Sequence, residues 1–238
     1  MKLLSVIRNW RKSHILKGEY LSSKREPFFD LASKYLPKGD ELVVDIGAGD
    51  GGFARFLKAQ SKCPNLFLLD GNKETVENLS KNHGNAILYN ASGPLPFPDA
   101  SIYFMHCSHI LEHLTPGGLH GFLREIDRVL ASGGILAISA PLLWPGFYED
   151  LSHIKPYNPQ AFIDYFCSGG NNLTFSPISK DYQVEKLVYR YRAGSFDEGW
   201  DSKFFFASLF LKIIKTLAEK TGFYKTIKNG FTLILRKK

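Results

Sequence analysis

The hydrophobic and polar positions of this chain follow two periods. Short apolar runs typical of buried strands recur from Leu42 onward, and apolar residues at helical spacing lie between them. The later strand-like runs are 65–70, 86–89, 101–107, 134–140, 182–191 and 231–236, and the helix-like stretches are 52–60, 73–81 and 118–130, the last closing at 132–134. Strands alternating with helices predict a doubly wound, mostly parallel α/β sheet with helices on both faces.

Other helical patterns fall outside this alternation. Residues 28–36 form one that ends at Pro37, and 158–167 form another. Basic residues interrupt the apolar positions of Lys2 to Lys17, which fits a helix packed on its own domain, a lid over a ligand cleft or a surface-binding helix. The run 203–221 is apolar over more than one face and has lysines at its flanks, so it fits core packing, an oligomer interface or peripheral contact with a membrane.

Length and composition predict one domain. A chain of 238 residues with 44% hydrophobic content can bury one large core. We expect a single domain, 1–238: N-terminal helices in 1–40, a ligand-binding core in 41–141, and an acceptor-binding half in 142–238 with a helical insertion at about 197–228.

The cysteines and the charge indicate the surroundings. Cys63, Cys107 and Cys167 form no CxxC pair, so they predict neither a disulfide framework nor a thiolate zinc site. The N-terminus lacks the continuous apolar core of a signal peptide, and no run approaches the ~20 apolar residues of a membrane span. A cytoplasmic location is expected, with or without peripheral membrane contact. The net charge of +7 suits an anionic partner such as nucleic acid, a phosphorylated substrate or a lipid surface.

The stretch 42–57, LVVDIGAGDGGFARFL, predicts a strand that ends in a glycine-rich loop. Gly47, Gly49 and Gly52 satisfy GxGxxG, and Asp70 follows at the end of the next strand, where an acid accepts hydrogen bonds from a ribose. Nicotinamide and S-adenosylmethionine sites both share these marks. Asp45 favours the second, because a carboxylate at the loop entrance repels a pyrophosphate and attracts a sulfonium with an α-amino group.

Five motifs in this order resemble those of the class I S-adenosylmethionine-dependent methyltransferases, type 11 group: VVDIGAGDGGF, LLDGN, GPLPFPDASI, SHILEHL and EIDRVLASGGILAISAP. They cover about 41–141. The resemblance implies a Rossmann-like seven-stranded sheet whose last strand is antiparallel, and S-adenosyl-L-methionine as the cofactor.

The resemblance also implies the cofactor residues. Gly47 and Gly49 line the methionine part, Asp70 holds the ribose hydroxyls, and Gly71 with Asn72 borders the adenine. The full predicted set is Asp45, Gly47, Ala48, Gly49, Asp70, Gly71, Asn72, Asn90, Ala91, Ser92, Ser108 and His109. Two positions depart from the family pattern, since Asn90 and Tyr103 stand where acids are common.

His106, His109 and His113 raise the question of a metal site. They could share a face on a helix, but His106 is expected to belong to the strand and no carboxylate pattern completes a ligand set. We therefore expect no metal. Ser108 and His109 are expected to line the cofactor pocket instead.

The segment after Pro141, PLLWPGFYEDLSHIKPYNPQ, predicts an acceptor pocket with aromatic walls. His153 is the candidate general base. Asp150 either orients His153 or caps a turn. Similar enzymes that act on sugars or lipid-linked sugars carry a D-x-x-H-x-x-x-Y segment here, which favours a hydroxyl acceptor.

The sequence thus predicts a methyltransferase that acts at oxygen on a small-molecule or glycan acceptor. A nucleic-acid methyltransferase is less favoured, because an Asn/Asp-Pro-Pro-aromatic signature is replaced by 107–110, Cys-Ser-His-Ile. Weaker matches to the pattern are a nicotinamide oxidoreductase, which Asp45 disfavours, and a non-catalytic cofactor-binding partner protein. The sequence leaves the question of an oligomer open.

Overall fold

A computed structural model describes residues 19–21, 24–62, 65–169, 173–194, 205–221 and 225–238. The main elements in chain order are β1 (Glu19–Leu21), α2 (Glu26–Ser33), β2 (Leu42–Ile46), α3 (Gly52–Ala59), β3 (Asn65–Asp70), α4 (Lys73–His83), β4 (Ala86–Leu88), β5 (Ile102–Ser108), α5 (Pro116–Val129), β6 (Leu130–Pro141), α6 (Pro159–Ile163), β7 (Tyr182–Gly194), α7 (Phe205–Thr221) and β8 (Lys225–Lys237). Two 3-10 turns, η1 (Leu111–His113) and η2 (Phe147–Glu149), and a π-helical turn, η3 (Asp164–Ser168), connect them.

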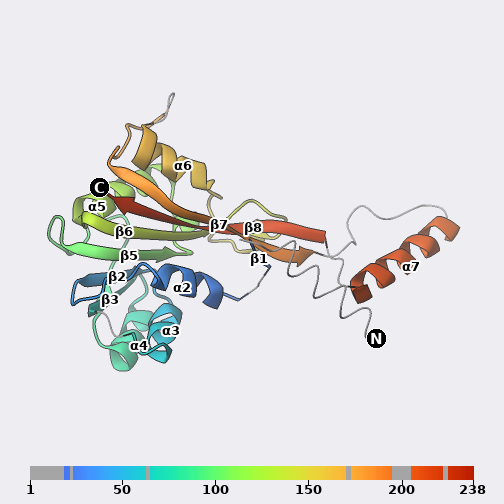
Figure 1. The fold of residues 1–238 in the computed structure, drawn as a ribbon, viewed down its shortest axis with the longest axis horizontal. Coiled ribbons are helices and arrows are strands. Elements are labelled where there is room, and N and C mark those ends of the chain that lie inside the picture. The colour runs from blue at the N-terminus through green and yellow to red at the C-terminus, as the bar shows by residue number, and fades with distance from the viewer. Residues whose placement is uncertain (1–18, 22–23, 63–64, 170–172, 195–204, 222–224) are drawn as a thin grey trace. The chain divides into compact units, whose positions relative to one another are not determined.

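The strands form one sheet in the order β1-β7-β8-β6-β5-β2-β3-β4 (Figure 1). β2 pairs in parallel with β3 on one side and with β5 on the other, and β8 is antiparallel to β6. The predicted Rossmann-like sheet with an antiparallel last strand is confirmed. The sequence pattern missed β1, a three-residue strand parallel to β7. The chain runs outward from β2 to β3 and β4 and then returns to the other side of β2 as β5. The carboxyl end of β2 is therefore the switch point where ligands bind in such sheets.

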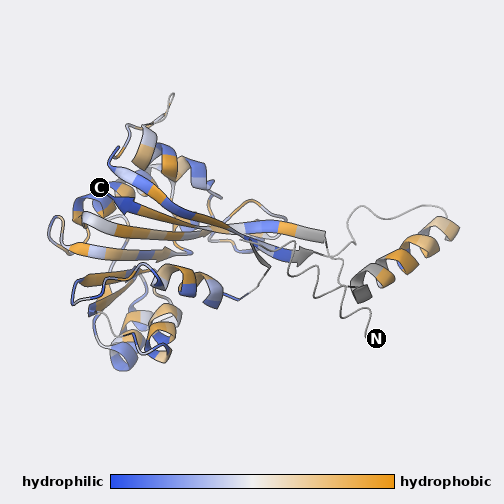
Figure 2. Cartoon of the chain, in the orientation of Figure 1, coloured by the Kyte–Doolittle hydropathy of each residue, from blue (hydrophilic) through white to orange (hydrophobic). Residues whose placement is uncertain are grey.

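The core lies against the middle strands. Val43 and Phe104 project from the sheet toward Phe29 of α2 and toward Phe53 and Leu57 of α3. Helices α3 and α4 lie on one side of the strands and α6 on the other (Figure 1). Apolar residues run along the middle strands, whereas α3 and α4 carry both kinds of residue (Figure 2), as expected for helices with one buried face.

Helix α5 ends earlier than the sequence predicts. Leu130 is already the first residue of β6, so the prediction that the helix runs to 130 and closes at 132–134 is wrong. Gly133 has a φ of +79°, and a Cβ on Gly134 would lie 2.8 Å from the carbonyl oxygen of Ala131. The two glycines therefore form an irregularity inside the strand, where the register against β5 shifts.

The described chain divides into two compact units. One comprises 1–23 and 188–229, and the other comprises 24–187 and 230–238 and holds the whole predicted cofactor region. The prediction of a single domain remains a prediction. Some predictions fall outside the described residues. They are the expected N-terminal helix, Lys2 to Lys17, and two single residues, Cys63 and Lys203.

Helix α7 belongs to the first unit and confirms a helix within the predicted insertion. Several of its apolar side chains are exposed: Phe206, Leu209, Phe210, Ile213 and Leu217. Within the described ranges, no helix is both long and apolar enough to cross a bilayer.

Candidate active site

The loop after β2 is a tight turn that glycine makes possible. Gly47, Gly49 and Gly51 have φ angles of +72°, +54° and +77°, in the left-handed region that side chains disfavour. A Cβ on Gly47 would also lie 3.2 Å from the Cβ of Ile110. The Gly47 N–H donates to the Leu69 carbonyl at 2.8 Å, which fixes the loop to the end of β3.

Asp70, the last residue of β3, connects this loop to the next turn. Its Oδ2 accepts from the Gly49 N–H and its Oδ1 from the Asn72 N–H, each at 2.9 Å. An ionised carboxylate has about four lone-pair positions, so both oxygens keep capacity for a ligand hydroxyl. Asn72 in turn caps α4, because its Oδ1 accepts from the Thr75 N–H at 3.2 Å.

A cavity of about 400 Å³ opens at the carboxyl end of β2, beside this loop. It is lined by Arg25, Gly47, Gly49, Asp70, Gly71, Tyr89, Asn90, Ala91, Ser108, His109, Ile110 and His113. The structure thus brings most of the predicted cofactor residues together. Asp45, Ala48, Asn72 and Ser92 do not line the cavity.

Asp45 lies beneath the loop rather than at its surface. Its Oδ1 is 2.7 Å from Nδ1 of His106, and both side chains are almost fully buried. The His106 ring stacks on Phe53, with 4.2 Å between the centroids. A carboxylate that faces a buried histidine has its charge partly compensated, so the expected choice of a sulfonium over a pyrophosphate by Asp45 stays a prediction.

The other two predicted residues away from the cavity have structural contacts. Ala48 is buried and packs with Ala54 and Leu68. The N–H and Oγ of Ser92 donate to Asn90 Oδ1 at 3.1 and 3.0 Å. Ser92 therefore orients the side chain that borders the cavity.

Four lining residues were missed by the sequence reasoning: Arg25, Tyr89, Ile110 and His113. Tyr89 donates its hydroxyl to the Gly93 carbonyl at 2.9 Å, and burial raises the pKa of the phenol. His113 could have been found from the sequence, because it belongs to the LEH motif. Arg25 precedes the motif series, and no motif indicates it. Tyr103, one of the two departures from the family pattern, is 42% exposed near the start of β5 and does not line the cavity.

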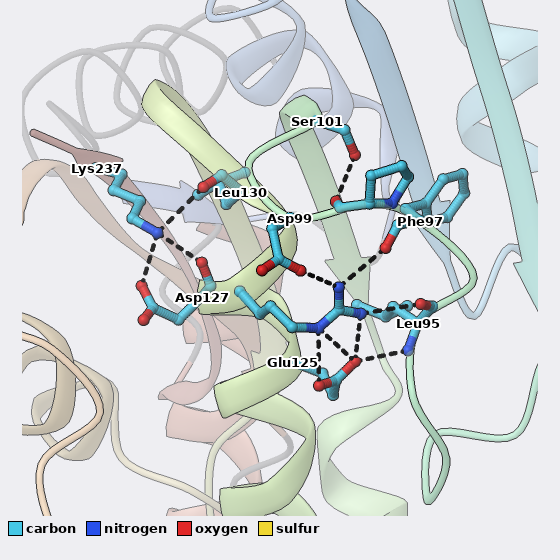
Figure 3. A network of polar contacts seen from close by, with 10 residues as sticks. Leu95, Phe97, Asp99, Ser101, Glu125, Asp127, Leu130 and Lys237 are labelled. Atoms are coloured by element: carbon cyan, nitrogen blue, oxygen red, sulfur yellow. Dashed lines mark hydrogen bonds and ion pairs between the residues drawn. The ribbon is translucent and has the colours of Figure 1, made fainter.

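Two motifs of the series are joined through Arg128 of α5. Figure 3 shows the carbonyl groups of Leu95 and Phe97 and the carboxylates of Asp99 and Glu125 around one guanidinium. The distances from Arg128 to these four groups run from 2.7 to 3.0 Å. The hydrogen bond from Arg128 holds the pKa of the Glu125 carboxyl below its ordinary value. The LPFPD segment that follows the cavity residues is thereby fixed to α5.

The predicted acceptor segment is tied to the LEH turn, η1. The backbone N–H groups of Ile154 and Lys155 donate to the Glu112 carbonyl at 2.8 and 3.3 Å. The Tyr157 hydroxyl donates to the Leu114 carbonyl at 3.0 Å. Motifs about 40 residues apart therefore form one structure beside the cavity.

His153 has a defined tautomer. Its Nδ1 lies 2.6 Å from the Phe147 carbonyl oxygen, and a carbonyl can only accept, so Nδ1 carries the proton and Nε2 holds the lone pair. The ring lies beside that of His113, with 5.0 Å between centroids. His153 is thus adjacent to a residue that lines the cavity.

Asp150 caps a turn. Its Oδ1 accepts from the hydroxyl and the N–H of Ser152 at 2.5 and 2.9 Å. These two hydrogen bonds hold the pKa of the exposed Asp150 carboxyl below its ordinary value. The Phe147 carbonyl orients the His153 ring, and Asp150 contacts His153 through its backbone, because its carbonyl accepts from the His153 N–H at 3.1 Å.

Solved methyltransferase structures share this fold. A solved S-adenosylmethionine-dependent methyltransferase from Archaeoglobus fulgidus superposes with a TM-score of 0.58 at 19% identity, over 96% of this chain and 98% of that chain. A Methanosarcina mazei S-adenosylmethionine-dependent methyltransferase superposes with a TM-score of 0.54 at 15% identity, over 87% of this chain and 96% of that chain. The chain has the class I methyltransferase fold.

The sequence comparisons find similarity to a family model and to a curated relative. Residues 44–138 match the family model of the methyltransferase domain, type 11. An Arabidopsis thaliana protein named "Probable pectin methyltransferase QUA3" is 31% identical over 124 residues, 50% of this chain and 20% of the relative. This chain spans about a fifth of the length of that relative.

The residues around the cavity fit S-adenosylmethionine. The glycine loop exposes backbone where a ligand can approach, and a Cβ on Gly49 would meet only the Gly47 carbonyl oxygen, at 4.0 Å. Asp70 presents a carboxylate with remaining lone pairs at the end of β3, and Asn90 presents an amide at the end of β4. These groups are the kinds that ribose hydroxyls and a base edge bind.

Proposed function

We propose that this protein transfers a methyl group from S-adenosyl-L-methionine to a hydroxyl group of a sugar-type or other small-molecule acceptor. The observation that carries the proposal is the position of His153, which the Phe147 carbonyl orients with its Nε2 lone pair available and which lies against His113 at the border of the cavity. A hydroxyl is a poor nucleophile until its proton is removed, so such a reaction needs a base at this place.

The bound cofactor supplies a methyl group already activated on a sulfonium sulfur. The protein must therefore hold the acceptor oxygen about 3 Å from the methyl carbon and receive its proton. The Asp70 and glycine-loop contacts orient the cofactor side, and His153 Nε2 accepts the proton on the acceptor side.

Two further observations support a glycan acceptor. The D-x-x-H-x-x-x-Y segment is 150–157 of this chain, and its His153 and Tyr157 side chains both make contacts that fix the segment. In addition, one relative is named as a probable pectin methyltransferase, which supports a carbohydrate acceptor without distinguishing a hydroxyl from a carboxylate. An amine acceptor would leave the base without a role.

The experiment uses cofactor labelled in the methyl group and parallel arms with sugars, lipid-linked sugars, amines and RNA. We expect label in a carbohydrate arm, in a product whose methyl group resists alkaline hydrolysis as an ether does. Label only in RNA or only in an amine contradicts the proposal and supports a nucleic-acid or an amine methyltransferase, respectively.

The base is tested by His153→Asn. We expect turnover to fall by about 10²- to 10⁴-fold, the usual contribution of a general base, while cofactor affinity by calorimetry stays unchanged. The matched control is His120→Asn, because His120 binds the Ser176 carbonyl and does not line the cavity. Full turnover in the His153 variant removes His153 as the base.

A further inference from the structure

Three side chains with metal-ligating atoms converge where η1 meets the loop after η2. They are Glu112, His113 and His153, and one potential ligand atom of each lies within 4.8 Å of the others. Glu112 is buried, and the two histidines are partly buried. Ligands of one tetrahedral ion at about 2.0–2.2 Å lie about 3.4 Å apart, so modest side-chain movement would bring the three to a common ion.

Both histidines have the tautomer that metal binding requires. Nδ1 of His113 lies 3.1 Å from the Ser152 carbonyl oxygen, and Nδ1 of His153 lies 2.6 Å from that of Phe147. Since carbonyls only accept, each Nδ1 carries the proton and each Nε2 keeps its lone pair. A backbone carbonyl bound to the other ring nitrogen is the usual outer-shell partner of a metal-bound histidine.

Glu112 supplies the observation that points to a ligand. Its Oε1 lies 3.0 Å from Nδ1 of His109, whereas its Oε2, although buried, has no hydrogen-bond partner among the described residues. The side chain is 1% exposed. A buried carboxylate oxygen without a partner is costly and calls for a cation.

We propose that Glu112, His113 and His153 bind a divalent transition-metal ion of the zinc type. Two imidazoles with one carboxylate suit Zn²⁺ and neighbouring metals better than Mg²⁺, which prefers oxygen ligands. Three protein ligands leave a coordination position open, as in catalytic zinc sites. Because His113 also lines the cavity, the ion would lie at its border.

The expectation of no metal, drawn from the sequence, concerned a different set of residues: His106, His109 and His113. The structure pairs His106 with Asp45 and His109 with Glu112, so neither contributes to this site directly. His153 replaces them, from a loop about 40 residues beyond His113.

For the reaction, this inference rests on the proposed function. A hydroxyl bound at the open position has its pKa lowered by the ion, as zinc lowers that of water to about 7. The hydroxyl proton passes to solvent. The oxygen electron pair forms the bond to the methyl carbon, and the carbon–sulfur bond breaks with its pair remaining on sulfur. With the ion bound, His153 would be a ligand, and the ion would replace general-base catalysis by acidifying the bound hydroxyl, whose proton solvent accepts.

The test measures binding without cofactor or acceptor. The untagged full chain is treated with a chelator, dialysed and titrated with Zn²⁺ or Co²⁺ by calorimetry, with elemental analysis of the dialysed complex. We expect one ion per chain and visible d–d bands from Co²⁺ in a site of low coordination number. Loss of an outer-shell partner costs 10- to 100-fold in affinity, so we expect His113→Asn and His153→Asn each to weaken binding by about 100-fold or more.

Glu112→Gln tests the carboxylate, and circular dichroism checks that each variant folds. His120→Asn is the matched control and should bind the ion with wild-type affinity.

Absence of a stoichiometric ion in the wild type, or unchanged affinity in the His113→Asn/His153→Asn double variant, overturns the metal site. Methyl transfer to a hydroxyl by chelator-treated protein at the full rate also overturns the catalytic part while leaving the proposed function intact. Stoichiometric ion binding without transfer to any hydroxyl supports the site and contradicts the proposed function.

Discussion

The two sides of the cavity are built in different ways. On the cofactor side, backbone groups and glycines of consecutive strand-to-helix turns hold one another, as when Gly49 donates to Asp70. On the acceptor side, side chains from two segments about 40 residues apart meet, and Glu112 keeps an oxygen without a partner among the described residues. The first side is therefore held by local backbone geometry, whereas the second is a group of side chains suited to proton or metal chemistry.

The largest effect is expected from His106→Ala, beneath the cofactor side. It leaves the Asp45 carboxylate buried without its hydrogen-bond partner, which typically costs about 1–3 kcal/mol of the free energy of unfolding and more for a charged group. Urea denaturation followed by circular dichroism measures this loss. A loss below about 1 kcal/mol would show that the pair does not hold the frame together.

The double variant Asp45→Asn/His106→Gln is the control for that prediction. It keeps two hydrogen-bonding groups but removes the carboxylate charge, so it should lose less stability than His106→Ala. It also separates structure from ligand choice. If Asp45 favours the sulfonium through its charge, the folded double variant binds S-adenosylmethionine more weakly than the wild type does.

Asp70→Ala should weaken cofactor binding at least about tenfold, since one charge-assisted hydrogen bond contributes about 1.5–3 kcal/mol. The change removes both the proposed ribose contact and the hydrogen bond to the Gly49 N–H. Calorimetry with S-adenosylmethionine measures the affinity. Asp99→Ala is a suitable control, because Asp99 is exposed and bound to Arg128 rather than to the cavity. Unchanged affinity in the Asp70 variant contradicts its assignment to the ribose.

The fold and the cofactor side could largely be predicted because their signals are local. The GxGxxG spacing and Asp70 lie in adjacent turns of one β-α-β unit. The spacing of the apolar residues indicated the alternation of strands and helices. The end of α5 was mispredicted because Gly133 and Gly134, typical of a helix C-cap, also suit a bulge inside a strand. Local sequence does not distinguish the two.

The acceptor side required the structure. The partner of Asp45 is His106, on a neighbouring strand, and no spacing rule gives such a pairing. Likewise, the sequence is compatible with two roles for Asp150, orienting His153 or capping a turn. Its hydrogen bonds with Ser152 show that it caps a turn. The meeting of Glu112 with His153 depends on how the loop after η2 returns to η1, which is a property of tertiary packing.

The smallest expected effect belongs to Tyr157→Phe, which removes a single hydrogen bond between the acceptor segment and the LEH turn. The Tyr157 hydroxyl donates to the Leu114 carbonyl at 3.0 Å, and burial raises the pKa of the phenol, so it stays protonated as a donor. One such bond contributes about 0.5–1.5 kcal/mol. Because the cofactor side is held by other contacts, S-adenosylmethionine affinity should not change, whereas the amides of Ile154 and Lys155 should exchange with deuterium about threefold to tenfold faster. Tyr148→Phe, at an exposed ring in the same loop, is the matched control. If Tyr157→Phe also lowers the affinity for S-adenosylmethionine, the two sides of the cavity act as one unit. That result would contradict the distinction between them.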